Sequence, residues 1–582
     1  MSPEPATPTL PSPDVEAPST PHRRPSTIRV TGRPRGIVVP RRGMVALPAL
    51  ASGVGLALSL PPWGWWILAF PAAGLLWWRL GGLRPRTRLW AGWLAGLGCY
   101  LPGLMFVRSF TVPGAMVLIA IEAGFFAAAA LLVPRGPVVA RALAFPAAMT
   151  LAEALRMTWP FGGLPLGGVF LGQAGGPLLG VARLGGPLAL TGAVYVGGMG
   201  VAAMAEVAVR ALRDGVRARS FARADAQGSS SQAATPTATA ASTGIGLRTV
   251  SGATAGMGAL TLVGAIALSA MVGASIVADH APDGGPSVGT VSAAAVQGGG
   301  ARGFRKSQIH PAVVLAAQLS ATQRMQRLDG GHAPRLVVWP EDVVSVDGRL
   351  SDSTEQAALS GLAQSLHTTL VVGVTETVSA TAFRNEVVAW GPDGTLVSRY
   401  EKVHRVPFGE YVPYRGFFEH LGNLSAVPRD AIPGTGTGLL ATPAGPLGAM
   451  VSFEVLYGDR GRSSVRAGAQ LLIVPTNTAS YATAQVPTQE LASAEVQAVE
   501  QGRDLLQAAP TGYSAAITNR GALLERSVLG AQQIVFSAMS RRVGWTLYVR
   551  FGNPPVLIAA ALALVAAWLV AGRRKRIGGT RP

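Results

Sequence analysis

Trp-Pro-Glu at residues 339–341, Glu-Lys-Val-His-Arg-Val-Pro-Phe-Gly-Glu-Tyr at residues 401–411 and Ser-Phe-Glu at residues 452–454 are the most informative segments of this chain. They place a carboxylate, an amine and a hydroxyl at wide spacing. Such residues converge when they follow neighbouring strands, and a base, a lysine and a nucleophile are the groups that covalent acyl chemistry needs. The three segments therefore predict an acyl-transfer site.

The sequence around these segments alternates between strand-like and helix-like patterns. Helical stretches are expected around 311–327, 354–367 and 488–508, and short apolar runs rich in β-branched residues occur at 289–291, 335–339, 369–374, 448–451 and 470–475. This alternation favours an α/β sandwich. Glu341, Ser452 and Asn477 each follow an apolar run, and active groups of α/β proteins gather at the carboxyl ends of strands.

Long apolar segments dominate the rest of the chain. The 582 residues are 49% hydrophobic and have a mean hydropathy of +0.34, which favours an integral membrane protein. A spanning helix needs about 20 apolar residues. Eight segments come near that length: 44–60, 64–78, 89–107, 112–133, 138–155, 184–205, 251–278 and 555–571. We expect a helical bundle of about eight spans with both chain ends on the same side.

The net charge of +19 is concentrated beside these spans. Residues 281–553 carry 22 Lys and Arg against 21 Asp and Glu, whereas the rest of the chain carries 27 against 9. The arginine clusters fall on one side of an eight-span arrangement, as the positive-inside bias predicts. The charge therefore indicates orientation and attraction to anionic lipid, and it argues against nucleic-acid binding.

These patterns divide the chain into seven segments. We expect a disordered basic cytoplasmic tail at 1–42, six spans within 43–213, a flexible cytoplasmic loop at 214–250, a seventh span at 251–278, an extracytoplasmic domain at 281–553, an eighth span at 555–571 and a basic cytoplasmic tail at 572–582. The first tail lacks the apolar core of a cleavable signal peptide. Cys99, the single cysteine, cannot form an internal disulfide, and no histidine spacing indicates a metal site, so no metal or cofactor is expected.

Charged residues also occur within the spans. Glu122 lies in the middle of the fourth span, where an acid is costly enough to be a functional candidate. Pairing with Arg108 or with a polar backbone group is the alternative. Glu153 and Arg156 stand one helical turn apart at the outer end of the fifth span, and we expect them to pair and hold the following Trp159 loop at the headgroup level.

In their order along the chain, these segments resemble apolipoprotein N-acyltransferases, bacterial membrane enzymes whose extracytoplasmic domain belongs to the nitrilase superfamily of Glu-Lys-Cys hydrolases. The resemblance runs from about Val45 to Trp568. Its strongest parts are the Trp-Pro-Glu segment, the Lys402 segment continued to Pro413, and the segment that contains Glu454. Weaker parts are residues 296–298, 153–156 with 161–165, and 548–553.

The resemblance implies an αββα sandwich and a role for each site residue. Glu341 would be the general base, and Lys402 would stabilise the oxyanion. Glu410 and Glu454 would orient Lys402, relay protons or form structural ion pairs. Ser452 stands where the family has a cysteine, and a hydroxyl ionises far less readily than a thiol of pKa ~8.5. Its acyl-enzyme would be an oxyester, so both half-reactions are expected to slow.

By the same resemblance, a phospholipid would donate an acyl chain through residue 452 to the diacylglyceryl-cysteine at an apolipoprotein N-terminus, at the bacterial cell membrane. Two alternatives stay open. One is a catalytically silent membrane scaffold, for instance for a polyprenyl-phosphate mannosyl synthase, and the other is a membrane-anchored amidase. Ser452 favours the scaffold, whereas Glu341 and Lys402 favour an enzyme.

Overall fold

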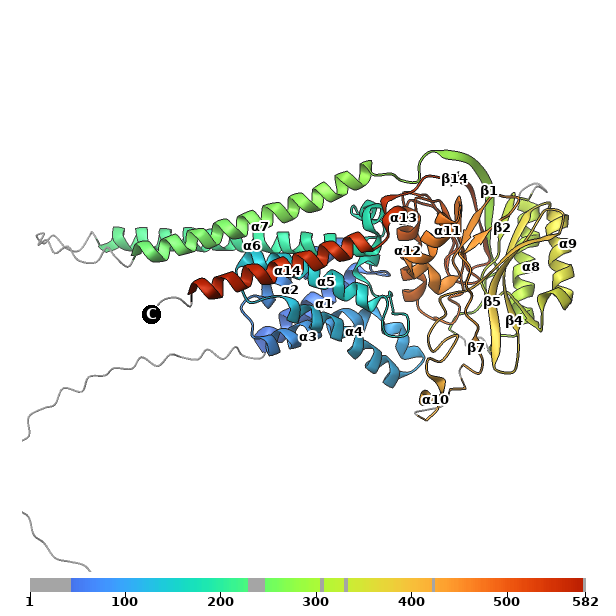
Figure 1. Ribbon diagram of the computed structural model, residues 1–582, viewed down its shortest axis with the longest axis horizontal. Helices are drawn as coiled ribbons and strands as arrows, with labels where there is room; N and C mark the ends of the chain where they lie inside the picture. Colours follow the sequence, from blue (N-terminus) through green and yellow to red (C-terminus); the bar gives the residue numbers. More distant parts are fainter. Residues whose placement is uncertain are drawn as a thin grey trace, which may run out of the picture. The chain divides into compact units, whose positions relative to one another are not determined.

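The computed structural model describes residues 43–228, 246–303, 308–328, 333–420, 424–425 and 427–578. The expected tail at 1–42 lies outside the described residues, as do residues 229–245 of the expected loop and 579–582 of the C-terminal tail. The described chain contains a helical bundle and an α/β domain that extends from β1 to β14 (Figure 1).

A helix coincides with each of the eight expected spans. They are α1 (Gly43–Ser59), α2 (Ala69–Leu80), α3 (Pro85–Gly103), α4 (Val112–Leu132), α5 (Val138–Arg156), α6 (Ala182–Gly228), α7 (Gly246–His280) and α14 (Pro554–Gly578). Within the described ranges, five helices are long and apolar enough to cross a membrane, namely α4, α5, α6, α7 and α14, while α1 and α2 are apolar but shorter. The membrane-helix class is confirmed, and the number of spans stays a prediction.

Small residues allow the bundle helices to approach closely. A Cβ atom at Gly53 of α1 would lie 1.9 Å from the Ala95 carbonyl oxygen of α3, and one at Gly96 would lie 2.5 Å from the Ala123 Cα of α4. Backbone packing of this kind replaces the hydrophobic driving force that helices lack in lipid. α6 continues to Gly228 and α7 begins at Gly246, so residues 214–228 and 246–250, expected as loop, are helical. The alanine and arginine content of the α6 extension favours a helix.

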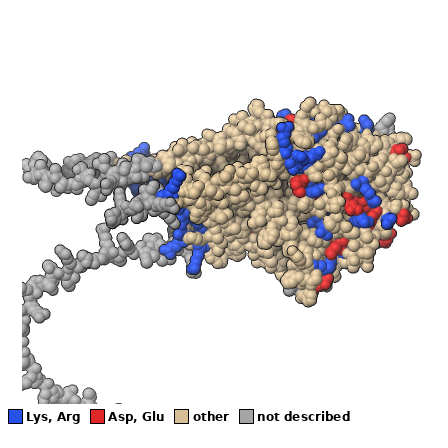
Figure 2. Space-filling view, in the orientation of Figure 1, with Lys and Arg blue, Asp and Glu red and all other residues tan. Residues whose placement is uncertain are grey.

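Charge is unevenly distributed on the visible surface. Figure 2 shows Lys and Arg at one end of the bundle, charges of both signs on the α/β domain, and between them a surface without these residues. An uncharged band is what the hydrocarbon core of a bilayer requires.

Two packed sheets form the α/β domain. The first has the strand order β14 (Gln533–Arg542), β1 (Ser287–Gln297), β2 (Leu336–Val338), β4 (Thr369–Thr377), β5 (Ala382–Trp390) and β6 (Leu396–Glu401), with β3 (Val344–Asp347) paired to β4 and β7 (Asp430–Ala431) paired to β5. The second has the order β13 (Leu523–Arg526), β12 (Ala515–Ile517), β11 (Leu505–Ala508), β10 (Leu471–Pro475), β9 (Leu447–Ala449) and β8 (Leu439–Leu440). Strands β1, β2 and β4 are parallel, as are β9, β10 and β11.

Successive side chains along a strand point to opposite faces of the sheet, so they pack in different layers of the domain. In β1, Ala293 and Ala295 lie in the core between the sheets, whereas Ala294 and Val296 pack toward the outer helices. α8 (Pro311–Leu328) and α9 (Thr354–Leu366) cover the first sheet, and α11 (Gly458–Arg466) and α12 (Gln485–Gln501) cover the second (Figure 1). The four layers confirm the expected αββα sandwich.

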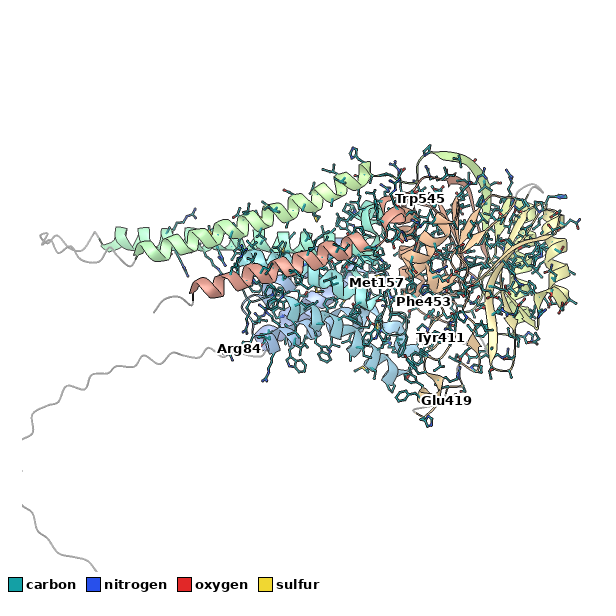
Figure 3. All side chains as sticks on the ribbon, viewed as in Figure 1. Arg84, Met157, Tyr411, Glu419, Phe453 and Trp545 are labelled. Carbon is teal, nitrogen blue, oxygen red and sulfur yellow. The ribbon has the colours of Figure 1, made fainter. Side chains whose placement is uncertain are left out.

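The bundle and the α/β domain share one apolar core. Met157, just after α5, and Phe453, just after β9, belong to the same buried cluster and are labelled in Figure 3. Polar contacts come from the start of α12. Gln485 Oε1 accepts from the Phe106 N–H at 2.9 Å, and Gln489 Oε1 accepts from the Gly167 N–H at 2.9 Å. The first turns of α12 therefore pack against the bundle.

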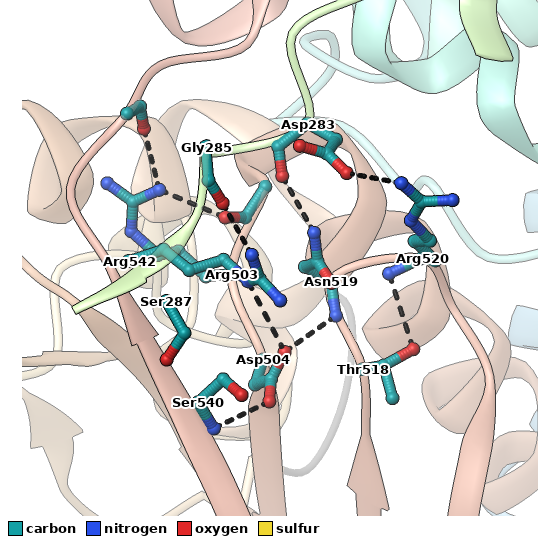
Figure 4. A network of polar contacts seen from close by, with 12 residues as sticks. Asp283, Gly285, Ser287, Arg503, Asp504, Thr518, Asn519, Arg520, Ser540 and Arg542 are labelled. Carbon is teal, nitrogen blue, oxygen red and sulfur yellow. Dashed lines mark hydrogen bonds and ion pairs between the residues drawn. The ribbon is translucent and has the colours of Figure 1, made fainter. Parts of the chain in front are cut away.

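A polar clamp holds the chain where it enters the α/β domain from α7 (Figure 4). Asp504 accepts hydrogen bonds from the Asn519 N–H at 2.9 Å and the Ser540 N–H at 2.7 Å. The Asn519 side chain donates to the Asp283 carbonyl at 2.8 Å, and Arg520 pairs with the Asp283 carboxylate at 2.9 Å. The clamp thus joins the segment after α7 to the ends of three strands.

Arg156, the last residue of α5, is fully buried and pairs with two carboxylates. Its guanidinium lies 3.2 Å from Glu122 Oε2 and 2.7 Å from Glu153 Oε1. It also donates to the carbonyl oxygens of Leu164, Pro165 and Leu166. Glu122 therefore pairs with Arg156 and not with Arg108, the partner considered from the sequence. The expected pair of Glu153 and Arg156 is present, and it holds the loop that follows α5.

Arg156→Ala should strongly destabilise the protein, because it leaves two buried carboxylates unpaired. Breaking a buried pair costs roughly 3 to 5 kcal/mol, whereas an exposed pair contributes ~0.5 kcal/mol. Arg210→Ala is the matched control, since Arg210 pairs with Glu206 on an exposed turn of α6. Thermal unfolding in detergent should show a much larger fall in Tm for Arg156→Ala. Equal falls in the two variants would contradict the assignment.

Candidate active site

Lys402 is the centre of a buried polar cluster beside the first sheet. It directly follows β6, and its N–H donates to the Asn385 carbonyl at 2.9 Å, which extends the β5–β6 pairing by one residue. Its Nζ lies 2.9 Å from Glu341 Oε1 and 2.9 Å from Glu410 Oε1. Burial disfavours the ammonium, but the two carboxylates outweigh this effect and raise the pKa of Lys402. The two carboxylates therefore favour the ammonium form of Lys402.

Glu341 reaches Lys402 from the end of β2. The Gly373 N–H donates to the Pro340 carbonyl at 3.1 Å, so the pairing of β2 with β4 continues to the residue before Glu341. A Cβ at Gly373 would lie 2.5 Å from the Glu341 Cα, so this close approach requires glycine. The Asn385 amide donates to Glu341 Oε1 at 2.8 Å. Burial raises the pKa of the Glu341 carboxyl, and the charge of Lys402 opposes this rise.

Glu410 closes the turn that follows Lys402. Its Oε1 accepts from Lys402 Nζ at 2.9 Å and from Asn385 Nδ2 at 2.8 Å, and its Oε2 accepts from the Val406 N–H at 2.7 Å. Asn385 on β5 therefore bridges the two carboxylates that hold the lysine. Sequence reasoning missed Asn385, and an amide within an otherwise well-buried strand is the signal that could have identified it.

Ser452 lies just past β9 and begins the 3₁₀ turn η7 (Ser452–Leu456). Its φ of 50° falls in the left-handed region, which non-glycine residues adopt rarely and keep when surrounding contacts hold them. Its residue surface is 9% exposed. The hydroxyl is thus presented from a tight, largely buried turn.

Glu454 connects this turn to the Lys402 loop. The carboxylate is fully buried and accepts four hydrogen bonds, from the Val451 N–H at 2.9 Å, the Val403 N–H at 2.7 Å, the His404 N–H at 3.0 Å and the Tyr400 hydroxyl at 2.9 Å. Three of these donors are backbone groups from the two loops. These contacts indicate that Glu454 positions the backbone of the two loops, a role not considered from the sequence, while Glu341 and Glu410 contact Lys402 directly.

Glu490 on α12 is a further carboxyl beside Ser452. Thr476 Oγ1 donates to Glu490 Oε1. Burial raises the pKa of Glu490 to about 7, the charge of Glu341 adds to the rise, and Lys402 opposes it. Sequence reasoning missed Glu490, because it lies inside a helix and has no local motif.

The loop after β10 extends from this cluster to the bundle. Asn477, expected near the site, accepts from the Ala479 N–H at 3.0 Å and so stabilises its own turn. The Tyr481 ring packs edge-on against Phe106 and Phe110 of the bundle, with centroids 5.4 and 5.5 Å apart. Burial raises the pKa of Tyr481 to about 12, and the charge of Glu490 adds to the rise. Tyr481 therefore lies between the bundle and the site.

A second contact joins the loop after α5 to the loops around the site. The Tyr457 hydroxyl donates to the Gly163 carbonyl at 3.0 Å, and the Tyr411 hydroxyl donates to the Phe161 carbonyl at 3.3 Å. The Phe161 ring lies 5.8 Å from Phe408, and it also contacts Tyr414 and Phe418. Phe408 is 46% exposed. Aromatic side chains thus pack between the loop after α5 and the chain that follows Lys402.

The cluster supplies the groups required for acyl transfer. It combines a largely buried hydroxyl, two carboxyls with raised pKa and a lysine whose pKa is also raised. Such groups accept a proton, attack a carbonyl carbon and stabilise the resulting oxyanion. The residues that the structure describes contain no group of three or more His, Cys, Asp or Glu placed to hold a metal ion.

Comparison with known proteins places two regions of the chain in families. Residues 52–200 match the apolipoprotein N-acyltransferase N-terminal domain, and residues 292–541 match carbon-nitrogen hydrolase. An apolipoprotein N-acyltransferase of Mycolicibacterium smegmatis is 29% identical over 90% of this chain and 84% of its own length. One of Brucella melitensis is 29% identical over 91% of this chain and 96% of its own length. One of Geobacter metallireducens is 32% identical over 42% of this chain and 47% of its own length.

Glu490→Gln should alter how stability depends on pH. A carboxyl whose pKa rises on folding from 4.5 to about 7 stabilises the folded state while protonated. This contribution is present below pH ~4.5 and is lost as the pH rises through 7, at ~1.4 kcal/mol per pKa unit. Glutamine stays neutral, so the Tm of Glu490→Gln should rise relative to wild type between pH 5 and pH 8. Glu419→Gln, at an exposed position, is the control. A Tm difference that does not change with pH would refute this prediction.

Proposed function

Because the chain belongs to the apolipoprotein N-acyltransferase family of carbon-nitrogen hydrolases, we propose that it transfers an acyl chain from a membrane phospholipid to a lipoprotein. The acceptor is the α-amino group of the diacylglyceryl-cysteine at the lipoprotein N-terminus. The reaction passes through an acyl-enzyme on Ser452.

The observation that carries this proposal is the buried Lys402 ammonium, shared between Glu341 and Glu410 beside the Ser452 turn. A positive charge in a site with little water stabilises a developing oxyanion by several kcal/mol. Its two carboxylate partners keep it protonated and in place. The site therefore suits a reaction whose transition state gains negative charge on a carbonyl oxygen.

In the first half-reaction, Ser452 Oγ attacks the carbonyl carbon of a phospholipid ester while its proton passes to a carboxylate. The oxyanion forms near Lys402. Collapse of this intermediate breaks the bond to the lysophospholipid oxygen, which leaves as an alcohol after taking up the proton. The product is an ester between the acyl chain and Ser452.

In the second half-reaction, the lipoprotein amine attacks this ester and loses a proton to Glu341. Collapse forms the amide, and Ser452 Oγ regains a proton. An oxyester is a poorer donor to an amine than a thioester. We therefore expect slow turnover compared with family members that have a cysteine at this position.

The position of the candidate active site beside the bundle suits substrates that are anchored in a membrane. Both the phospholipid and the lipoprotein are held there by their acyl chains, so they meet the enzyme in two dimensions. Phe161, Phe408 and Tyr481 line the approach from the bundle. Aromatic residues suit the boundary between acyl chains and headgroups.

The proposed topology places the α/β domain outside the cytoplasm and both chain termini inside. The arginine clusters beside the spans support this orientation, and so does the uncharged surface between the basic end of the bundle and the α/β domain (Figure 2). The domain limits expected from the sequence remain part of this proposal.

A catalytically silent scaffold is the second candidate function, and Ser452 in place of a cysteine is the observation that favours it. A polyprenyl-phosphate mannosyl synthase as its partner stays a prediction. Burying charged groups costs several kcal/mol each before their attraction offsets the cost. Retention of Lys402 with Glu341 and Glu410 therefore supports an enzyme over a scaffold.

Glu341→Gln and Lys402→Ala should each lower acyl transfer at least ~100-fold, because one removes the base and the other the charge that faces the oxyanion. The assay combines membranes, phospholipid and a diacylglyceryl lipopeptide. Glu386→Gln is the matched control, since Glu386 is a buried carboxylate next to Asn385 on β5 that pairs with Arg399 instead. A wild-type rate of acyl transfer in Glu341→Gln or in Lys402→Ala would contradict the role assigned to that residue.

Single-cysteine labelling should reveal the topology, because the native Cys99 is buried. Ser365→Cys lies on an exposed turn of α9, and Ser220→Cys on an exposed turn of α6. A membrane-impermeant maleimide should label Ser365→Cys in intact cells and Ser220→Cys after lysis. The reverse pattern, or labelling of both after lysis alone, would contradict the proposed orientation.

A further inference from the structure

Two arginines of α11 converge on the end of α13 (Leu547–Phe551), the short helix that precedes α14. Arg462 Nε donates to the Val549 carbonyl at 2.9 Å, and its Nη2 donates to the Arg550 carbonyl at 3.2 Å. Arg466 Nη1 donates to the same two carbonyls, at 3.4 Å each. Because both guanidiniums reach the Arg550 carbonyl, their positive charges lie close together. The side chain of Arg550 is itself exposed, so we call Arg462, Arg466 and Arg550 the arginine cluster.

The charge of the arginine cluster is not compensated within the protein. Among the residues that the structure describes, no carboxylate forms an ion pair with any of the three side chains. Asp459, the acid on α11, lies 3.5 Å from His404 instead. A guanidinium has several N–H donors, and the carbonyls of α13 accept from only one nitrogen of Arg466. Like charges repel one another, so an anion bound at the cluster would stabilise it.

The arginine cluster lies where the chain passes from the α/β domain into the bundle. α14, which is long and apolar enough to cross a membrane, begins at Pro554. Trp545 and Phe551 are exposed beside the cluster, and the Arg466 guanidinium lies 5.2 Å from the Trp545 ring centroid. Figure 3 places Trp545 at the boundary between the bundle and the α/β domain, and Figure 2 shows Lys and Arg side chains gathered over this region. Aromatic and basic residues beside a span mark the level of the lipid headgroups.

An anionic phospholipid matches each part of this surface. Guanidinium groups bind phosphate through paired N–H donors, and they do so better than ammonium groups. Beyond the cluster, α14 presents Ile558 and Leu562, which are exposed apolar residues that acyl chains can contact. A soluble anion would use the arginines alone. The sequence of charge, aromatic ring and apolar face therefore favours a lipid.

We propose that Arg462, Arg466 and Arg550 bind the phosphate of an anionic phospholipid at the headgroup level beside α14. This site goes beyond the proposed acyl transfer, because it lies outside the Lys402 cluster and holds a lipid without reacting with it. The bound lipid ties α11, the helix that follows the Ser452 turn, to the membrane surface.

Native mass spectrometry of the full chain in detergent tests this site with two lipids, the anionic phosphatidylglycerol and the zwitterionic phosphatidylcholine. Wild type should bind phosphatidylglycerol at least ~10-fold more tightly, since each basic side chain near an anionic headgroup adds roughly 5-fold in affinity. Arg466→Gln combined with Arg550→Gln should remove most of this preference, whereas Arg466→Lys combined with Arg550→Lys should keep most of it. Arg462 is left unchanged because it caps α13.

Arg349→Gln is the matched control, because Arg349 is exposed and precedes α9, at the end of the α/β domain that faces away from the bundle (Figure 1). It should keep the wild-type preference. Equal affinities for the two lipids in wild type, or an unchanged preference in the double glutamine variant, would overturn the proposal. Displacement of phosphatidylglycerol by excess inorganic phosphate would identify a soluble anion as the ligand and would overturn it as well. Each of these results leaves the acyltransferase proposal standing.

Discussion

A buried ammonium that cannot exist without carboxylate partners organises this protein. Lys402 is 2% exposed, and its charge is compensated by Glu341 and Glu410, each 2.9 Å away. Those two carboxylates come from separate loops, one after β2 and one within the turn after β6, and Asn385 on β5 bridges them. An unpaired charge at this depth would cost several kcal/mol, so the three segments can pack in this way only together.

The second sheet joins this centre through two other carboxyls with different tasks. Glu454 accepts backbone hydrogen bonds from the Lys402 loop and from the turn before Ser452, so it sets the distance between the two loops. Glu490 lies buried on α12, whose first turns also contact the bundle. The same helix therefore contacts both the η7 turn, through Ser493 and the Val455 carbonyl, and the bundle. The Arg156 cluster has a comparable role in the bundle, where it holds the loop that meets Tyr457.

Local patterns made much of this structure predictable. Runs of apolar residues identified the bundle helices, and strand-like runs followed by Glu341 and Ser452 identified the sheets and the edge where the site lies. Asn385 and Glu490 were not predicted, because their importance comes from partners 14 to 44 residues away, which the register of strands and helices decides. Arg108 was considered as one possible partner of Glu122, but the structure shows Arg156, at the end of the neighbouring helix α5, as the partner. Residues 214–228 were expected to form a loop because of their polar composition. Such a composition also permits an exposed helix, and these residues are helical.

In the proposed reaction, Ser452 acts where the resemblance to apolipoprotein N-acyltransferases implies a cysteine. A hydroxyl needs more help to lose its proton and gives a less reactive acyl-enzyme. Mass spectrometry of lipoprotein N-termini, in a host without any other member of this family, tests the central claim most directly. The account predicts N-acylated diacylglyceryl-cysteine in cells that make the protein and a free α-amino group in cells that lack it. Free α-amino groups in both would contradict it.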